Sequence, residues 1–480
     1  RCGMIYMEPR SLGLDVLVKS WIQYRLPEAA KQHGEQLQKL FDDYLDPCIF
    51  WLRRNIEEPV PTVDNNLCMS CLNVMDCYMN TYIVKEGIDE PLSKHRLDQL
   101  AKTIEPMFLF AFTWSLGCTG DLNGREKFDK WFRGHMQEKG VQMPFPDEGM
   151  VYDYVLDTYS TQDGKANPDP QWVNWLDTRP EFEMPKGAEF QDMIIPTKDS
   201  ICYTYLFDIL ANNQKMCLHT GVSGTGKTVN IMRYLQQGLN PSKQMPLTLT
   251  FSAQTSANMT QDILDGKMDK RRKGVFGPPA GKQYIILVDD LNMPKKEEYG
   301  AQPPIELLRQ WADHGGWFDR KTLTFMGIVD LIWVAAMGPP GGGRQPVTNR
   351  YMRHFNIIGY TALKNDSMEL IFNTIMTDFL KNQFPEEVTE SGPNVISATT
   401  AIYRNIEKEL LPTPEKSHYT FNLRDMSKVI QGMLGGNNKC ITSKNDLLIL
   451  WVHECRRVFQ DRMINNKDRS WFEGQLQTLM

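Results

Sequence analysis

Residues 221–228 read GVSGTGKT, and this stretch matches the pattern G-x-x-x-x-G-K-[ST] at every fixed position. It follows the apolar run KMCLHT (215–220), which predicts a strand, and it leads into residues 227–239, whose spacing predicts a helix. A strand, a glycine-rich turn and a helix start in this order let main-chain N–H groups surround phosphate oxygens. The residues expected to bind a nucleotide are Gly221, Val222, Ser223, Gly224, Thr225, Gly226, Lys227, Thr228 and Val229.

The chemistry of such a loop gives roles to two of its side chains. The Lys227 ammonium would reach the β- and γ-phosphates of ATP, and the Thr228 hydroxyl would ligate Mg²⁺. Further acids are expected where a strand of the same sheet ends, and YIILVDD (284–290) ends in Asp289 and Asp290. We expect Asp289 to hold Mg²⁺ and Asp290 to be the general base for hydrolysis. The alternative is a strand end capped by two solvated acids.

Apolar strands alternate with helices between residues 200 and 360. This alternation predicts an α/β fold in which a parallel sheet is covered by helices on both faces. Besides the helix at 227–239, a helix opened by Pro303 is expected at 303–314. The strands are expected at 215–220, 246–252, 284–290, 331–337 and 355–360.

The texture of the sequence changes three times and predicts four segments. They are a helical region at 1–150, a connector of short hairpins at 151–200, the α/β nucleotide-binding region at 201–362 and a second helical region at 363–480. The first region begins with a predicted strand, MIYM (4–7), after Arg1. Arg350 and Arg353 likewise precede the strand FNIIGY (355–360) and a helical region. The chain therefore reads as the tail of one module followed by a complete second module.

The second helical region is expected to start near Asp366, with Glu369 three residues on as its capping partner. Arg350 and Arg353 have two interpretations. They are either solvated charges or donors of positive charge to a phosphate in a neighbouring module.

Composition excludes several classes of protein. With 53 Lys and Arg against 59 Asp and Glu, the net charge is −6, which argues against nucleic-acid binding. The longest apolar run, MFLFAFTW (107–114), is far shorter than the roughly 20 residues of a membrane-spanning helix. No secretory signal is recognised at the start, and the scattered cysteines fit a reducing compartment. We expect neither a nucleic-acid nor a membrane partner.

Three cysteines lie close together in the sequence, at Cys68, Cys71 and Cys77. One C-x-x-C pair lacks the second pair that a four-ligand zinc site needs, so a buried helix is the favoured interpretation over a metal site. The basic run DKRRKG (269–274) is expected to be an exposed or inter-subunit loop. The loop GPPGGGR (338–344) indicates only a tight turn.

Longer stretches carry a resemblance that covers nearly the whole chain. The sequence resembles a dynein heavy chain, and most of all the third AAA+ module of an axonemal, inner-arm type. RCGMIYMEP and FTWSLGCTGDLNGREKFDKWFR (112–133) resemble the end of the second module and its helical lid. The third-module stretches are GVSGTGKT, ILVDDLNMP (286–294), DKRRKGVFGPP (269–279), GAQPPIELLRQW (300–311), AAMGPPGGGR (335–344), NRYMRHFN (349–356) and LWVHECRRVFQDR (450–462).

The resemblance implies a five-stranded parallel AAA+ sheet sandwiched by helices, helical lid subdomains, and a place in a six-module ring that binds ATP or ADP with Mg²⁺. It implies that Ile195 and Pro196 line the adenine pocket and that Arg424 senses the γ-phosphate. Arg350 and Arg353 would face the nucleotide of the preceding module, and Arg1 the nucleotide before that. Implied partners are the neighbouring modules and, through parts outside these residues, intermediate and light chains and microtubules. The implied location is the cytoplasm and cytoskeleton, at the axoneme of a cilium or flagellum.

Two departures from the family's pattern bear on mechanism. Asp290 stands where AAA+ enzymes usually place Glu, and Gly338 stands where a polar sensor is common. Since positioning dominates phosphoryl transfer, we expect tight nucleotide binding with slow hydrolysis at a regulatory site. Two alternatives stay open: a nucleotide held permanently as a structural element, and a different multi-module AAA+ machine.

Overall fold

The computed structural model describes residues 3–83, 94–158, 160–162, 165–167, 169–179, 190, 193–381 and 383–480. The chain divides into two compact units, and each is described by itself. The first unit comprises Arg1–Thr178, Cys202–Val222 and Lys227–Thr361. The second comprises Arg179–Ile201, Ser223–Gly226 and Ala362–Met480.

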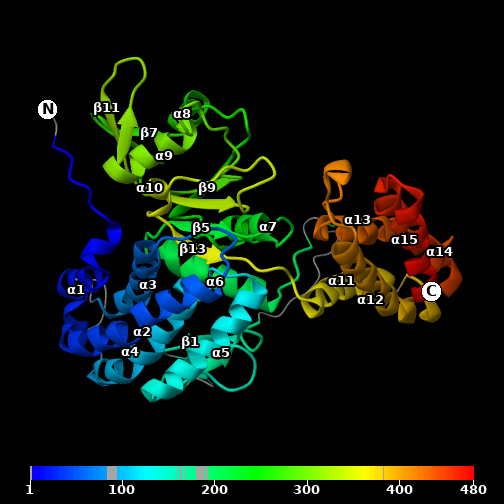
Figure 1. Ribbon diagram of the computed structural model, residues 1–480, viewed down its shortest axis with the longest axis horizontal. Helices are drawn as coiled ribbons and strands as arrows, with labels where there is room; N and C mark the ends of the chain where they lie inside the picture. Colours follow the sequence, from blue (N-terminus) through cyan, green and yellow to red (C-terminus); the bar gives the residue numbers. More distant parts are fainter. Residues whose placement is uncertain are drawn as a thin grey trace. The chain divides into compact units, whose positions relative to one another are not determined.

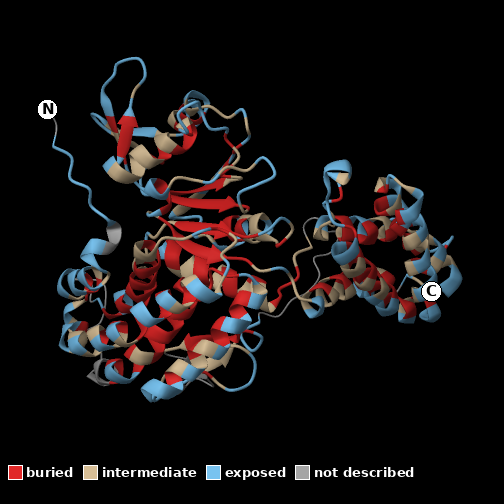
Figure 2. Cartoon of the chain, in the orientation of Figure 1, coloured by how far each residue is buried: buried red, intermediate tan, exposed pale blue. Residues whose placement is uncertain are grey.

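A five-stranded parallel sheet lies at the centre of the first unit (Figure 1), and this confirms the predicted sheet. Its order is β13-β5-β12-β9-β6, and every neighbouring pair is parallel. Strands β5, β12 and β13 are buried at every position (Figure 2), which explains their continuous apolar sequences. The strands are β5 (Cys217–Thr220), β6 (Gln244–Thr250), β9 (Gln283–Asp289), β12 (Leu331–Met337) and β13 (Asn356–Gly359).

The two edge strands of this sheet differ in their surroundings. Among the described strands, β6 pairs with β9 alone, and its residues Pro246, Thr248 and Thr250 are exposed. At the other edge, β13 is covered by the helices of the N-terminal region. The Arg125 guanidinium donates to the carbonyl of Gly359, and the Cys118 thiol lies 3.5 Å from the carbonyl of Ile357.

Helices connect the strands of the sheet. The helix after the P-loop begins as α7 (Lys227–Arg233) and continues as a π-helical turn (Tyr234–Gly238), so the predicted helix at 227–239 is confirmed. The predicted helix at 303–314 is α9 (Pro303–His314), whose Ile305 and Leu308 are buried in the core of the first unit. The remaining helices of this region are α6 (Lys198–Asn212), α8 (Ala257–Asp265) and the short α10 (Asn349–Met352).

The N-terminal region is helical, as predicted, but the predicted strand at 4–7 is wrong. Met4 to Met7 belong to no strand and are exposed, since a strand needs a neighbouring strand and none of the described strands pairs with them. Cys68, Cys71 and Cys77 are buried in one helix, as the favoured interpretation held. The helices are α1 (Asp15–Tyr24), α2 (Gly34–Asn55), α3 (Asp64–Met79), α4 (Lys94–Ser115) and α5 (Leu122–Lys139), with 3-10 turns at Pro9–Leu12, Glu28–His33 and Asn80–Tyr82.

The connector contains the short antiparallel pairs that the sequence predicted, after a 3-10 turn at Val151–Asp153. Strand β1 (Tyr154–Asp157) pairs with β4 (Gln171–Asn174), and β2 (Ser160–Gln162) pairs with β3 (Lys165–Asn167). No helix in the described part of the chain is long and apolar enough to cross a membrane.

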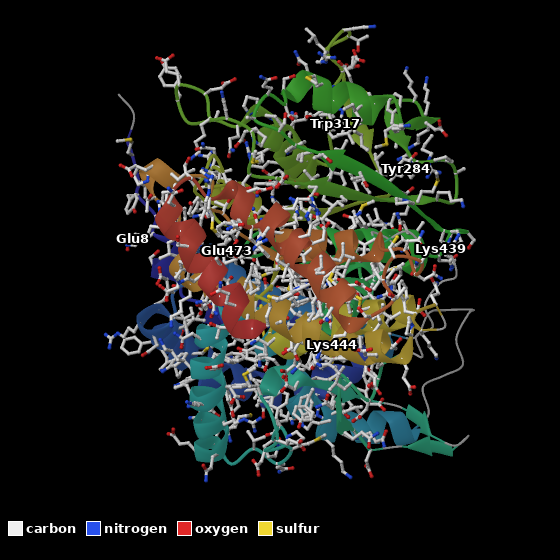
Figure 3. The ribbon with its side chains drawn as sticks, turned by 90° about the vertical axis from the view of Figure 1, so that its right-hand side faces the viewer. Glu8, Tyr284, Trp317, Lys439, Lys444 and Glu473 are labelled. Atoms are coloured by element: carbon white, nitrogen blue, oxygen red, sulfur yellow. The ribbon has the colours of Figure 1, made fainter. Side chains whose placement is uncertain are left out.

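A second, four-stranded sheet was not predicted. Its order is β10-β11-β8-β7, formed by β7 (Asp269–Arg272), β8 (Val275–Gly277), β10 (Gly316–Phe318) and β11 (Phe325–Ile328). The basic run expected as a loop therefore contains a strand, because β7 finds an antiparallel partner across the turn at Gly274. Two hydrogen bonds connect this sheet and its neighbouring segments, and both donors are labelled in Figure 3. Trp317 Nε1 donates to Asp265 Oδ1 (2.9 Å), and the Tyr284 hydroxyl donates to the Lys267 carbonyl (3.2 Å).

The second unit is a bundle of helices with its own apolar core. Its first helix starts at Asn365, and the preceding Lys364 makes no side-chain cap, so the capping pair predicted at Asp366 and Glu369 is wrong. Capping boxes do occur at two later helix starts of this unit, between Asn422 and Asp425 and between Ser443 and Asp446, the latter just beside the Lys444 labelled in Figure 3. The helices are α11 (Asn365–Leu380), α12 (Glu386–Glu409), α13 (Leu423–Leu434), α14 (Lys444–Val458) and α15 (Asn466–Leu479), with 3-10 turns at Pro414–Lys416 and Gln460–Arg462.

The close approach at the β13 edge makes Gly359 a test of the fold. A Cβ at Gly359 would overlap the Cys118 carbonyl oxygen, so Gly359→Ala must push the helical region off the sheet edge. We expect the variant to lose about 1–3 kcal/mol of unfolding free energy, the cost typical of overpacking. Thermal or urea unfolding of the purified chain measures this.

Gly134→Ala is the matched control for that substitution. Gly134 lies in α5, is exposed and has nothing within 4 Å of its hypothetical Cβ. Alanine is the better helix former by about 0.5–1 kcal/mol, so this variant should be as stable as the parent or more so. Equal stability of the Gly359 and Gly134 variants would contradict the packing described at the sheet edge.

Candidate functional site

The P-loop joins the end of β5 to the start of α7, as the sequence predicted. Its first residue, Gly221, has φ +150°, and a Cβ there would lie 2.6 Å from the carbonyl oxygen of Tyr360. Only glycine fits such an approach, because real Cβ atoms do not come this near to a backbone oxygen. Gly226, at the end of the loop, has φ +80° and precedes the helix directly.

The side chain of Lys227 is hydrogen-bonded to the beginning of the P-loop. Its Nζ donates to the carbonyl of Gly221 at 2.8 Å and to that of Val222 at 2.7 Å. The ammonium is thus placed over the first turn of the loop by main-chain oxygens. A role of this charge toward bound phosphates stays a prediction.

Thr228 and Asp289 meet although 61 residues separate them. The Thr228 hydroxyl lies 3.2 Å from Asp289 Oδ1 because α7 starts, and β9 ends, at the same edge of the sheet. Burial raises the pKa of the Asp289 carboxyl, and the charge of Asp290 adds to the increase. The Asp290 N–H, Thr228 and Lys227 oppose it.

This pair fits Mg²⁺. Two neighbouring oxygens in an octahedron with bonds of about 2.1 Å lie about 3 Å apart, and carboxylate and hydroxyl oxygens are the hard ligands this ion takes. The observed separation of 3.2 Å matches that spacing. The described residues contain no cluster of three or more His, Cys, Asp or Glu side chains that would hold a metal without further ligands. The remaining ligands would therefore be water and phosphate oxygens, as is usual for Mg²⁺.

Asp290 adopts a left-handed backbone conformation, with φ +52°. Its N–H donates to Asp289 Oδ1 at 3.0 Å, and its own side chain is 42% exposed. Left-handed non-glycine residues are uncommon, although Asp tolerates the region better than most. The turn therefore directs the two neighbouring carboxylates differently: Asp289 toward Thr228, and Asp290 toward Arg344, whose Nη2 lies 3.7 Å from its Oδ1.

Sequence reasoning missed Arg344 and Asn292 as members of this region. Asn292 is fully buried; its side-chain Nδ2 donates to the Gly338 carbonyl at 2.8 Å, and its main-chain carbonyl accepts from the Gln345 N–H at 2.8 Å. It therefore holds both ends of the loop that follows β12. A polar residue two positions after the acidic pair was a signal for Asn292, whereas Arg344 stood in a stretch that by itself indicates only a turn.

Arg350 and Arg353 lie at α10 and away from these contacts. Arg353 is 60% exposed and its Nη2 lies 2.5 Å from Asp313 Oδ1, an oxygen that His354 Nε2 also approaches at 2.9 Å. Arg350 is exposed, and no ion pair of its side chain is found among the described residues. A role for either arginine toward a neighbouring module stays a prediction.

The remaining predicted site residues belong to the second unit or lie outside the described residues. Ile195 and Pro196 are buried, and Arg424 is exposed in the first turn of α13. Ser223 to Gly226 are grouped with the same unit. Their roles toward the nucleotide stay predictions, and Arg1 lies outside the described residues.

His219 lies in β5, two residues before the loop, and is fully buried. Its Nδ1 is 3.2 Å from the Tyr360 hydroxyl. Burial lowers the pKa of His219 to about 3, and the positive charge of Lys227 adds to this effect. The imidazole is therefore neutral at physiological pH and adds no positive charge beside Lys227.

A P-loop after β5, an acidic pair at the end of β9, with β12 between these two parallel strands, and a separate helical unit are features of the AAA+ class of nucleotide-binding proteins. Three family models match the chain: a P-loop containing dynein motor region at residues 182–363, a dynein heavy chain AAA lid domain at 37–177 and an AAA+ lid domain at 395–479. The chain belongs to the dynein heavy chain family.

Its relatives include several axonemal heavy chains. Dynein axonemal heavy chain 1 of Mus musculus is 44% identical over all of this chain and 12% of the relative. Dynein axonemal heavy chain 12 of Mus musculus is 39% identical over 98% of this chain and 15% of the relative. Dynein axonemal heavy chain 3 of Homo sapiens is 38% identical over 98% of this chain and 12% of the relative. The chain thus spans less than a sixth of the length of these relatives.

The buried His219 predicts a pH dependence of stability. Its pKa in the folded protein is about 3, below the ordinary 6.5, so the unfolded chain binds more protons between these values. The unfolding free energy therefore falls as pH drops below about 6.5, by up to about 1.4 kcal/mol per pH unit from this group. Urea unfolding at several pH values between 7.5 and 5 tests this.

His219→Gln removes the titration and keeps a hydrogen-bonding side chain, so its stability should fall less steeply with acid. The exposed His314 provides the control, because His314→Gln should keep the slope of the parent. The same slope in the parent and in the His219 variant would refute the buried neutral histidine.

Proposed function

We propose that this chain is an ATP-hydrolysing AAA+ module of an axonemal dynein heavy chain, with slow turnover that regulates a microtubule motor of cilia or flagella. The observation that carries the proposal is the contact of Thr228 with Asp289, beside Lys227 and directly before Asp290. These residues would together provide a lysine for the phosphates, two oxygen ligands for Mg²⁺ and a further carboxylate.

Binding would use the loop from Gly221 to Val229 for the phosphates. Lys227 would exchange its bonds to the loop carbonyls for β- and γ-phosphate oxygens. Thr228 and Asp289 would hold Mg²⁺, and the ion would supply positive charge that stabilises the negative charge developing on the phosphates. Occupation by a dication would also favour the ionised form of Asp289, whose pKa burial raises.

Hydrolysis would use Asp290 as the general base. A water oxygen forms a bond to the γ-phosphorus, the bond from that phosphorus to the β–γ bridging oxygen breaks, and ADP leaves. Asp290 would accept the proton of the attacking water. Aspartate is one methylene shorter than the glutamate usual in AAA+ enzymes, and a misplacement of about 1 Å costs on the order of a hundredfold in rate. Slow turnover follows from this.

The second candidate function is a nucleotide held permanently as a structural element of the ring. The short Asp290 in place of the usual glutamate favours it. Bound ADP would then exchange far more slowly than a regulatory cycle permits. The rate at which excess ATP displaces fluorescent ADP separates the two functions.

The remaining roles come from the family. Ile195 and Pro196 would line the adenine pocket and Arg424 would sense the γ-phosphate. Arg350 and Arg353 would act on the nucleotide of the preceding module. On the proposed division, 1–150 is the lid of that preceding module, 151–200 the connector, 201–362 the large subdomain and 363–480 its lid. Microtubules and the intermediate and light chains would act through other parts of the heavy chain, in the cytoskeleton of the axoneme.

Lys227→Ala should strongly weaken nucleotide binding. Without the ammonium, the loop keeps its backbone but loses the charge that faces the β- and γ-phosphates. We expect saturable binding of a fluorescent ATP analogue with Mg²⁺ to the parent, and a loss of at least about tenfold in affinity in the variant. The control is Lys321→Ala, in the β10–β11 turn. Equal binding by parent and Lys227 variant would remove the loop from the proposal.

Asp290→Asn should abolish turnover and leave nucleotide binding intact, because the amide cannot accept the proton of water. Phosphate release in an intact heavy chain with only this site competent measures turnover. Asp330 is a matched control: it also has a left-handed backbone (φ +60°) and also pairs with an arginine, Arg271, at 2.9 Å. Asp330→Asn should keep the parental rate. Undiminished turnover in the Asp290 variant would exclude this residue as the base.

A further inference from the structure

Arg344 lies across Gly338, at the carboxyl end of β12. A Cβ built on Gly338 would come within 3.0 Å of Arg344 Nε, 3.1 Å of its Cζ and 3.2 Å of its Cδ. These distances are tighter than nine in ten real Cβ contacts. A Cβ at position 338 would therefore require the Arg344 side chain to move by a few tenths of an ångström.

The loop that carries Arg344 is fixed on both sides. Gly341 and Arg344 exchange main-chain hydrogen bonds of 3.0 Å in both directions, and the next residue, Gln345, is bound to the buried Asn292. Asn292 also binds the Gly338 carbonyl at 2.8 Å. The arginine thus starts from a short loop that is tied at both ends to the segment following the acidic pair.

The far end of Arg344 faces Asp290. Nη2 lies 3.7 Å from Asp290 Oδ1, while Nε is buried and has no hydrogen-bond partner among the described residues. A guanidinium that lies beside Gly338 and within ion-pair distance of one carboxylate can bias the direction of that carboxylate.

We propose that Arg344 is a positioning residue for Asp290, and that it takes over the place of a polar side chain at position 338. The inference rests on the proposed ATP hydrolysis at this site. The proposal relates the two departures from the family's pattern, Gly338 and Asp290, to each other. Glycine at position 338 leaves room for the Arg344 side chain, and Arg344 in turn orients the short Asp290. Hydrolysis would then depend on the pair of Arg344 and Asp290.

A second arginine–aspartate pair shows what is specific about the first. Arg271 also has a buried Nε without a described partner, and its Nη2 pairs with Asp330 at 2.9 Å. Asp330, however, directly precedes β12, whereas Gly338 directly follows it. Ligands gather at the carboxyl ends of parallel strands, so only the pair of Arg344 and Asp290 lies at the functional edge.

The test measures kcat and KM for ATP in an intact heavy chain with only this site competent. Arg344→Ala should lower kcat by about ten- to a hundredfold, while KM stays within about threefold, since positioning affects the reaction more than binding. Arg344→Lys keeps a charge and should recover part of the loss. Arg271→Ala should keep the parental kcat.

A double-mutant cycle tests the role of Gly338. Gly338→Ala crowds Arg344 and should lower kcat, and the combination with Arg344→Ala should cost little more than either change alone. Additive losses would show that the two residues act separately and would overturn the proposal.

The other outcomes are equally decisive. If Arg344→Ala has the parental kcat or a higher one, the positioning role is overturned. The proposed function would still stand in that case, because the parent hydrolyses ATP. Loss of nucleotide binding in both the alanine and the lysine variants would assign Arg344 to structure alone. Absence of turnover in the parent would refute hydrolysis itself, and the positioning role with it.

Discussion

The contact of Thr228 with Asp289 depends on the order of the central sheet. Strand β12 separates β5, which leads into the P-loop, from β9, which ends in Asp289. Because all three strands are parallel, their carboxyl ends reach the same edge, and residues distant in sequence meet there. A reversed β9 would carry both acids to the opposite edge. The direction of one strand therefore decides whether the phosphate loop has a metal-binding acid beside it.

Lys227 affects the pKa values of two titratable side chains at the carboxyl edge of the sheet, His219 and Asp289. His219 stays neutral because it is buried near Lys227, while burial and the neighbouring acid raise the pKa of Asp289. Both shifts reflect the energetic cost of burying charge without full compensation. On the proposed function, a bound dication would favour the ionised form of Asp289, and phosphate oxygens would balance the charge of Lys227.

The features that depend on local sequence patterns were predicted correctly. The P-loop, the five strands and the helix at 303–314 follow from glycine spacing, apolar runs and an opening proline, and the structure confirms them. The strand expected at 4–7 failed because a strand depends on a partner, which a short apolar run does not specify. The four-stranded sheet was not predicted for the same reason: its short strands depend on partners that the local sequence does not specify. Arg344 could not be foreseen, because its contacts with Gly338 and Asp290 join loops that are unrelated in sequence.

The two edges of the central sheet carry unequal risks of self-association. Helices shield β13, whereas β6 is an outermost strand whose main chain is a template for strand addition by another molecule. Pro246 interrupts that template, because it has no N–H to donate to an incoming strand. The exposed threonines at 248 and 250 add polar side chains along the same edge. Pro246 is thus expected to disfavour the pairing of β6 with a strand of another molecule.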